Sequence, residues 1–273
     1  MQDGARVWVC VVSDAHACSL SVLRREQTPS RRATRVEMAH EKVALLRALL
    51  IPGLPRYRVV APDGASSAPT KHIYLIRHGE ATHNVAPKPW GEELIDARLT
   101  EKGASQADAL RERAAALPVE LVVVSPLTRT LDTAMRSLGP LQQRGVPFVA
   151  VEECREQFGK NLPDKRRAIS AVASEFERVD FSGLRASDAD SLFTSERESL
   201  EALAARADRF LELLFARPET HIAVVTHSSF LAALLNAALD TSASPAASEW
   251  FANAELRELR LAPRAPGPAA GTS

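Results

Sequence analysis

Three clusters of polar residues in this sequence could act together on one ligand. They are Arg77-His78-Gly79, the segment 125–129 that ends in Arg129, and Thr226-His227. Each cluster follows a short apolar run, which is typical of a buried β-strand. Because open α/β sheets bind ligands outside the carboxyl ends of their strands, we expect the three clusters to meet at one edge of a sheet.

Residues of these types suit phosphoryl transfer. A phosphoryl group in flight carries charge on its equatorial oxygens and needs positioned donors and positive charge. Arg77 and Arg129 can each offer a bidentate fork to those oxygens, and His227 would add charge if it were protonated beside the dianion. We expect His78 to attack phosphorus as a neutral imidazole, because a carbonyl that holds its other nitrogen leaves a basic lone pair free.

The reaction also needs a carboxylic acid that protonates the leaving alkoxide. Glu156 is the candidate, in the loop after the apolar run 146–151. Glu152 and Glu153 lie close by, and a surface carboxylate is the ordinary role of any of the three. Neither an H-E-x-x-H pattern nor a P-loop occurs in the sequence.

The elements that must position these residues alternate between strands and helices. Apolar runs predict strands at 72–76, 121–124, 146–151 and 222–226, and an edge strand at 256–261. Helices are predicted at 38–50, 100–117, 198–215 and 229–239, and a further one starts after 126 and ends at Gly139-Pro140. This alternation predicts an α/β fold, a three-layer α/β/α arrangement with a mostly parallel central sheet.

Loop-forming residues at 62–69 separate the alternating region from what precedes it. We therefore expect residues 1–70 to be an N-terminal extension of unknown role that can be partly disordered. Residues 71–262 are expected to form the domain. Residues 263–273 are rich in Pro, Ala and Gly and lack apolar side chains to pack, so we expect a disordered tail.

The composition indicates which partners and which cellular compartment to expect. The 273 residues include 34 basic and 34 acidic ones, so the net charge favours neither nucleic acid nor a membrane surface as a partner. No apolar segment reaches the roughly 20 residues of a membrane span. Three cysteines without a C-x-x-C pattern favour a reducing compartment, and we expect the cytoplasm. Arginines among the first 35 residues leave a plastid or mitochondrial transit segment as the alternative. The oligomeric state cannot be derived.

Five motifs connect the sequence to a known family. In chain order they are L-I-R-H-G-E-A-T-H-N (75–84), D-A-R-L-T-E-K-G (96–103), S-P-L-T-R-T-L-D-T-A (125–134), C-R-E-Q-F-G (154–159) and V-V-T-H-S-S-F-L (224–231). In these motifs the sequence resembles the histidine phosphatase superfamily, which includes cofactor-dependent phosphoglycerate mutase. The segments D-K-R-R (164–167) and F-A-N-A-E-L-R (251–257) add a resemblance to plant and algal phosphoglycerate mutase-like proteins.

The resemblance implies a phosphoglycerate mutase-like fold and a role for each matched residue. His78 would be the phosphorylated residue and Glu156 the proton donor or acceptor. The phosphate pocket would consist of Arg77, Asn84, Arg129 and His227. The resemblance also implies that the chemistry uses no metal and no organic cofactor.

The function expected from these observations is a metal-independent phosphatase that hydrolyses small phosphate monoesters through a phosphohistidine. Its partner would be a small phosphorylated metabolite. True mutases carry L-N-E-R-H-Y-G where this sequence has the shorter C-R-E-Q-F-G, which favours a phosphatase over a mutase. Two alternatives stay open: a phosphoglycerate mutase-type phosphoryl transferase, and a non-catalytic phosphate-binding scaffold.

Overall fold

The computed structural model describes residues 31–49, 51, 53–61, 64, 68–88, 91–184 and 188–264. The chain divides into two units, Met1–Met38 and Ala39–Ser273. The described residues of the first unit form the first turns of helix α1 (Arg31–Ala48). Most of the arginine-rich segment 1–35 and residues 265–273 of the tail predicted at 263–273 lie outside the described residues. Pro263, the first residue of that predicted tail, instead ends the last strand of the sheet.

A seven-stranded sheet, counted over the described residues, forms the centre of the second unit, in the order β4-β3-β5-β2-β7-β1-β6. The strands are β1 (Tyr57–Val60), β2 (Lys71–Arg77), β3 (Leu121–Val124), β4 (Phe148–Ala150), β5 (His221–Thr226), β6 (Leu239–Asp240) and β7 (Leu256–Pro263). Strands β4, β3, β5 and β2 run parallel, as do β1 and β6, whereas β7 is antiparallel to β2 and β1. The predicted mostly parallel α/β sheet is confirmed.

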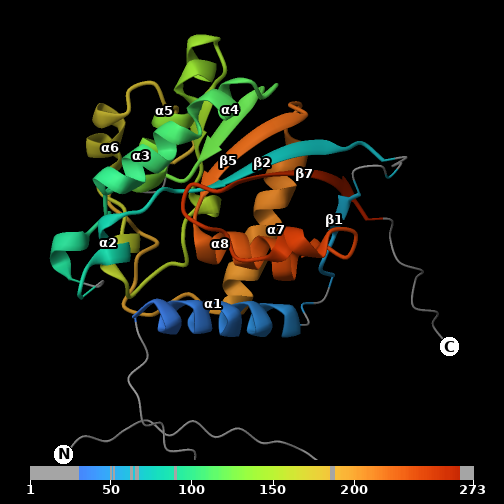
Figure 1. Ribbon diagram of the computed structural model, residues 1–273, viewed down its shortest axis with the longest axis horizontal. Helices are drawn as coiled ribbons and strands as arrows, with labels where there is room; N and C mark the ends of the chain where they lie inside the picture. Colours follow the sequence, from blue (N-terminus) through green and yellow to red (C-terminus); the bar gives the residue numbers. More distant parts are fainter. Residues whose placement is uncertain are drawn as a thin grey trace, which may run out of the picture. The chain divides into compact units, whose positions relative to one another are not determined.

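Helices cover both faces of the sheet (Figure 1). Besides α1 they are α2 (Thr82–Val85), α3 (Glu101–Ala109), α4 (Arg111–Ala115), α5 (Thr128–Gln143), α6 (Ile169–Glu175), α7 (Leu200–Ala216) and α8 (Ser228–Ala233). Alternate residues of β2 point to opposite faces. Ile73 and Leu75 share one buried cluster with Phe210 of α7, whereas Tyr74 shares another with Leu131 of α5. The helices and the sheet thus form three layers.

Several predicted helices differ from the structure. The helix predicted at 38–50 begins at Arg31, and the one predicted at 229–239 ends as an α-helix at Ala233 and continues as a π-helix over Leu234–Ala238. The helix predicted to end at Gly139-Pro140 continues through both residues as α5. Leu138 and Leu141 on either side of the proline are fully buried, so packing against the sheet holds the helix where local propensity would end it. The helix predicted over 100–117 is divided at Leu110 into α3 and α4.

The strand predicted at the edge of the sheet lies inside it, so that prediction is wrong. Strand β7 pairs with β2 on one side and with β1 on the other. Strand β1 and fully buried Leu46 of α1 both precede residue 71, and Leu46 belongs to the same core cluster as Val59. The compact unit therefore begins before the boundary predicted at residue 71, because the free edge of β7 and the open face of the core are both covered by earlier residues.

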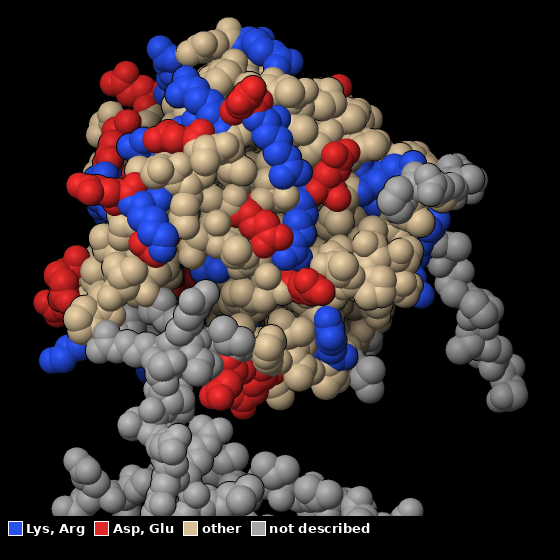
Figure 2. All heavy atoms as spheres, in the orientation of Figure 1, with Lys and Arg blue, Asp and Glu red and all other residues tan. Residues whose placement is uncertain are grey.

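Basic and acidic side chains are interspersed over the face of the molecule in Figure 2. This mixture agrees with the equal numbers of basic and acidic residues in the sequence. Among the helices of the described residues, none has both the length and the apolar character that crossing a bilayer would need.

Candidate active site

His78 lies in the turn directly after β2, with its ring buried. Its Nδ1 donates a hydrogen bond to the carbonyl oxygen of Gly79 at 2.7 Å. Because a carbonyl only accepts, Nδ1 carries the proton and Nε2 keeps its lone pair. Burial, followed by the charges of Arg129 and Arg77, holds the pKa of His78 well below its usual value. The ring is therefore the neutral imidazole expected from the sequence.

The turn that carries His78 packs closely against the start of α3. A Cβ on Gly79 would lie 2.4 Å from the carbonyl oxygen of Gly103, and a Cβ on Gly103 would lie 1.9 Å from that of Glu80. Thr100 caps α3 by accepting a hydrogen bond from the Gly103 N–H at 3.0 Å. The motif at 96–103 thus supports the turn after β2, because only glycine lets the two backbones approach so closely.

His227 directly follows β5, and its ring centroid lies 5.1 Å from that of His78. Its Nε2 lies 2.7 Å from the hydroxyl oxygen of Ser125, which follows β3. Its Nδ1 is buried and has no hydrogen-bond partner among the described residues. Burial, followed by the charge of Arg129, holds the pKa of His227 well below its usual value. The ring is neutral in the protein alone, so the protonated form expected beside a phosphate would need the charge of a bound dianion.

The two arginines reach the site from β2 and from the first turn of α5. Fully buried Arg129 donates from Nη1 to the carbonyl oxygen of Pro163 at 2.7 Å and from Nη2 to Asp164 at 2.8 Å. Its Nε is buried without a partner among the described residues. Arg77 donates from Nη1 to the carbonyl oxygen of Phe251 at 2.6 Å. The fork of Arg129 therefore faces Asp164, while its charge still lowers the pKa values of both histidines.

Asn84 has a capping role in the structure. Its Oδ1 accepts a hydrogen bond from the Ala81 N–H at 2.9 Å, and its Nδ2 lies 3.0 Å from Nε2 of His83. The ring of His83 lies 6.0 Å from that of His78. Asn84 thus shapes the turn beside His78, and its predicted contact with phosphate stays a prediction.

Glu156 lies where the loop after β4 meets the start of α8. Its Oε1 accepts hydrogen bonds from the N–H groups of Gln157 at 2.9 Å and Ser229 at 3.1 Å. Burial alone would raise the pKa of Glu156, but the charges of Lys42 and Arg197 and the Gln157 N–H outweigh burial and hold it below its usual value. The carboxyl group is ionised in the protein alone, so a bound dianion must raise its pKa before it can donate a proton.

Arg206 of α7 holds the loop that carries Glu156. Its Nη1 donates to the carbonyl oxygens of Glu153 at 2.7 Å and Arg155 at 2.9 Å, and its Nη2 donates to that of Glu156 at 3.1 Å. Arg206 is itself paired with buried Glu198 at 2.7 Å. The backbone before and at Glu156 is therefore fixed by one buried guanidinium group.

Four further residues around this site were not predicted from the sequence. Asp96 accepts a hydrogen bond from the Thr128 N–H at 2.8 Å and so anchors the start of α5. Asp164 lies between Arg129 and Arg197, and Lys42 approaches Glu156 from α1. Asp96 and Asp164 stand inside quoted motifs, which is a signal that could have found them. Nothing local marks Lys42 or Arg197.

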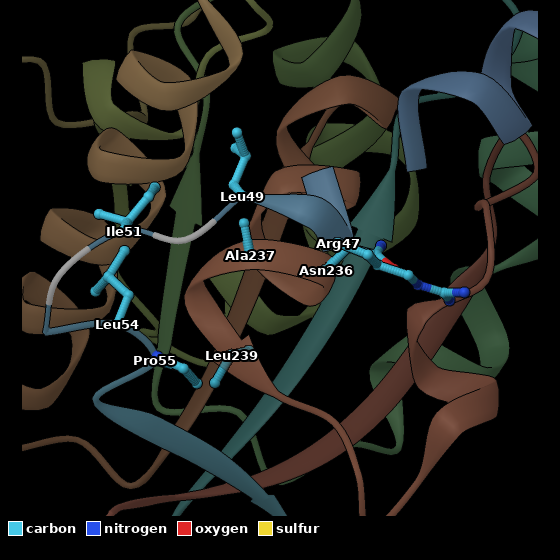
Figure 3. Close-up of a pocket in the computed structure, with 8 residues that line it drawn as sticks. All are labelled: Arg47, Leu49, Ile51, Leu54, Pro55, Asn236, Ala237 and Leu239. Carbon is cyan, nitrogen blue, oxygen red and sulfur yellow. The ribbon is translucent and has the colours of Figure 1, made fainter. Parts of the chain in front are cut away.

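A cavity of about 390 Å³ lies elsewhere, where the end of α1 and the segment before β1 meet the segment that leads into β6 (Figure 3). It is lined by Arg47, Leu49, Ile51, Leu54, Pro55, Asn236, Ala237 and Leu239. None of the six residues predicted for the active site is among them. Arg47 donates to the side chain of Asn236 at 2.7 Å.

The fold and the site define an α/β protein with two histidines and two arginines at the carboxyl ends of neighbouring parallel strands. Within the described residues, no three His, Cys, Asp or Glu side chains converge in the manner of metal ligands. The family model of the histidine phosphatase superfamily (branch 1) matches residues 73–268, and the chain belongs to this superfamily. The family resemblance found in the motifs is confirmed.

Relatives from plants are similar over most of the chain. Phosphoglycerate mutase-like protein 1 of Arabidopsis thaliana is 36% identical over 233 residues, which cover 71% of this chain and 82% of that protein. Phosphoglycerate mutase-like protein of the same plant is 38% identical over 201 residues, which cover 61% of this chain and 74% of that protein. Among solved structures, phosphoglycerate mutase from Bacillus anthracis str. Sterne is 17% identical with a TM-score of 0.49, covering 73% of this chain and 94% of that chain.

Proposed function

We propose that the protein is a phosphatase that hydrolyses small phosphate monoesters through a phosphohistidine at His78. The orientation of the His78 ring is the observation that carries this proposal. Its Nδ1 donates to the carbonyl oxygen of Gly79, which leaves the Nε2 lone pair for attack. Because burial and the neighbouring arginines lower its pKa, the ring keeps that lone pair even at acid pH.

The reaction has two steps. In the first, Nε2 of His78 forms a bond to phosphorus, the ester P–O bond breaks, and Glu156 gives its proton to the leaving oxygen. In the second, water attacks phosphorus, the P–N bond breaks, and ionised Glu156 accepts the proton of the water. Arg77, Arg129 and His227 stabilise the charge on the phosphoryl oxygens.

Two buried nitrogens support a phosphate at this place. His227 Nδ1 and Arg129 Nε have no hydrogen-bond partner among the described residues. Buried polar atoms of native proteins are nearly always paired, so an unpaired buried nitrogen needs an explanation. The oxygens of a bound phosphate would supply acceptors for both, provided that His227 carries its proton on Nδ1.

A mutase is the second candidate, because the plant relatives are named phosphoglycerate mutase-like. A mutase shares every step up to the phosphohistidine. The two functions differ in the acceptor, which is water for a phosphatase and a hydroxyl group of a second substrate for a mutase. The short segment C-R-E-Q-F-G at 154–159 favours water.

The test measures hydrolysis of p-nitrophenyl phosphate by the purified protein in the presence of EDTA. We expect turnover that vanadate inhibits, and nearly complete loss of turnover in His78→Ala. His72→Ala is the matched control, because His72 lies at the opposite end of the same strand and is expected to leave turnover unchanged. Labelled substrate should leave an acid-labile phosphate on the wild type and none on His78→Ala.

Each outcome separates one candidate from the others. Wild-type turnover in His78→Ala would show that the proposal is wrong. Interconversion of 3- and 2-phosphoglycerate that outpaces phosphate release would identify a mutase. Vanadate binding without turnover on a panel of sugar, carboxylate, nucleotide and inositol phosphates would identify a non-catalytic scaffold.

We keep the cytoplasm as the proposed compartment, with a plastid or mitochondrion as the alternative. The arginines among residues 1–35 support the alternative, and the absence of a C-x-x-C pattern supports a reducing compartment. A fluorescent fusion with and without residues 1–35 distinguishes them, because only a transit segment would change the location when it is removed.

A further inference from the structure

Lys42 of α1 reaches the active site from outside the region that the family model matches, which begins at residue 73. Its Nζ donates to Oε1 of Gln157 at 2.8 Å and to the hydroxyl oxygen of Ser229 at 2.9 Å. Figure 1 shows α1 running past α8, the helix that begins at Ser228. A helix before the matched region therefore contributes a side chain to the site.

The charge of Lys42 is not matched by an ion pair within the described part of the chain. Its two hydrogen-bond partners are neutral oxygen atoms, although the side chain is half-buried. Other buried cations nearby are paired with carboxylates: Arg155 with Asp190 at 2.6 Å, and Arg206 with Glu198 at 2.7 Å. Because burying a charge is costly unless it is paired, an ammonium group with neutral partners favours an anionic ligand.

The position of Lys42 indicates which part of a substrate it would meet. Gln157 follows Glu156 in the chain, and the Ser229 N–H donates to the Glu156 carboxylate at 3.1 Å. Both partners of Lys42 thus border the group that protonates the leaving oxygen. An anion held there would also favour the charged form of Lys42, whose pKa is lowered mainly by burial and raised in part by Glu156.

We propose that Lys42 binds a second anionic group on the leaving-group side of the substrate, so that the enzyme prefers phosphate monoesters that carry another negative charge. This inference rests on the proposed phosphatase function. It makes α1 a determinant of specificity. A purely structural role for Lys42, tying α1 to the rest of the molecule, would not distinguish a charged substrate from a neutral one.

The experiment compares matched substrates in the full chain. The probes are phosphate esters of short ω-hydroxy acids of increasing chain length. Each is compared with two further phosphate esters, one with a primary amide and one with a phosphonate in place of the carboxylate. For the best chain length we expect the wild type to show a kcat/KM about tenfold higher for the acid than for the amide. A factor of about ten corresponds to the free energy that one hydrogen bond between charged groups contributes. In Lys42→Met the ratio should fall to about one, mainly through a higher KM for the acid. Preference for acid or phosphonate identifies the second group.

Three controls keep the test decisive. Lys42→Arg retains the charge and should keep part of the preference. Arg113→Met removes one positive charge from an exposed position of α4 and should leave the ratio unchanged. Thermal unfolding followed by circular dichroism shows whether Lys42→Met is folded. Because Lys42 also lowers the pKa of Glu156, the variant can change turnover of both substrates, but such a change affects acid and amide alike and cancels in their ratio.

The outcomes separate this inference from the proposed function. Equal kcat/KM for acid and amide in the wild type, or a preference that Lys42→Met retains, would overturn the role of Lys42 while leaving the phosphatase intact. If no ester is hydrolysed, the proposed function fails. Dissociation constants of the same acid and amide pairs, measured by calorimetry on the wild type and Lys42→Met, then decide the inference by themselves.

Discussion

Glu156 is subject to two opposing influences. Burial favours its protonated form, whereas the charges of Lys42 and Arg197 favour the ionised form and prevail. A phosphate dianion beside the carboxylate would repel its charge and raise its pKa, so that the group becomes a proton donor when substrate is bound. After the leaving oxygen has taken the proton, the ionised form is ready to accept one from water. Its environment thus suits both steps of the proposed reaction.

Replacing Glu156 should therefore affect substrates according to their leaving groups. In Glu156→Gln, we expect release of an alkoxide in the first turnover to slow by roughly a hundredfold or more, as the loss of a general acid typically does. Release of p-nitrophenolate should slow far less, because this leaving group needs no proton. Rapid-mixing measurements of the first turnover check this for an alkyl phosphate and p-nitrophenyl phosphate.

The neighbouring carboxylate provides the control for this prediction. Glu153→Gln makes the same change three residues away and should leave both rates near those of the wild type. An equal loss for both leaving groups in Glu156→Gln would contradict proton donation by Glu156 and would instead indicate a disturbed site.

At the scale of elements, α1 and β1 complete the sheet and its core. Strand β1 pairs with β7 and β6, and Leu46 of α1 is fully buried in the same cluster as Val59 of β1. These two elements cover a sheet edge and an apolar face that the region from residue 71 on would leave open. The helix that carries Lys42 is therefore held in place by hydrophobic packing as well as by hydrogen bonds.

This packing can be tested with two adjacent leucines. Leu46→Ala should lower the free energy of unfolding by about 2–5 kcal/mol, the usual cost of a cavity in place of a buried leucine. Leu45 is 52% exposed, so Leu45→Ala should change the free energy of unfolding by no more than about 0.5 kcal/mol. Urea unfolding followed by circular dichroism measures both. A negligible effect of Leu46→Ala would show that α1 does not pack on the core.

At the scale of the whole molecule, the two buried histidines of the candidate site link stability to pH. The pKa values of His78 and His227 are both held well below the usual value, chiefly by burial. The unfolded chain binds protons at these histidines from about pH 6.5 downward, whereas the folded chain does not. The unfolded state therefore gains protons first as pH falls, which lowers the free energy of unfolding.

We accordingly expect the two histidines to leave the free energy of unfolding unchanged above about pH 6.5. Below that pH, each should lower the free energy of unfolding by up to about 1.4 kcal/mol per pH unit. Urea unfolding at about pH 7.5 and about pH 5.5 measures the difference. The double variant His78→Gln/His227→Gln should show a smaller difference, whereas His40→Gln on exposed helix surface serves as the control. An undiminished pH dependence in the double variant would contradict this account.

Much of this organisation could be predicted from local patterns. Short apolar runs before Arg77, Ser125 and His227 marked the central strands, because burial on both faces leaves a continuous apolar signature. The order of polar clusters after those strands predicted that His78 and His227 would meet, and their rings lie 5.1 Å apart. The fold class and the grouping of the two histidines were thus accessible without coordinates, because both follow from strand direction in a parallel sheet.

Other features depended on contacts between distant parts of the chain. Helix α5 continues through Pro140 because buried neighbours hold it, and β7 lies inside the sheet because β1 pairs with its far edge. Lys42 and Ser229 are 187 residues apart in sequence, and no local pattern marks the lysine as part of the site. The sequence alone determined which groups could perform the chemistry and on which strands they lie. Only the tertiary structure decided what surrounds those groups, because burial and charge pairing depend on neighbours that chain folding brings together.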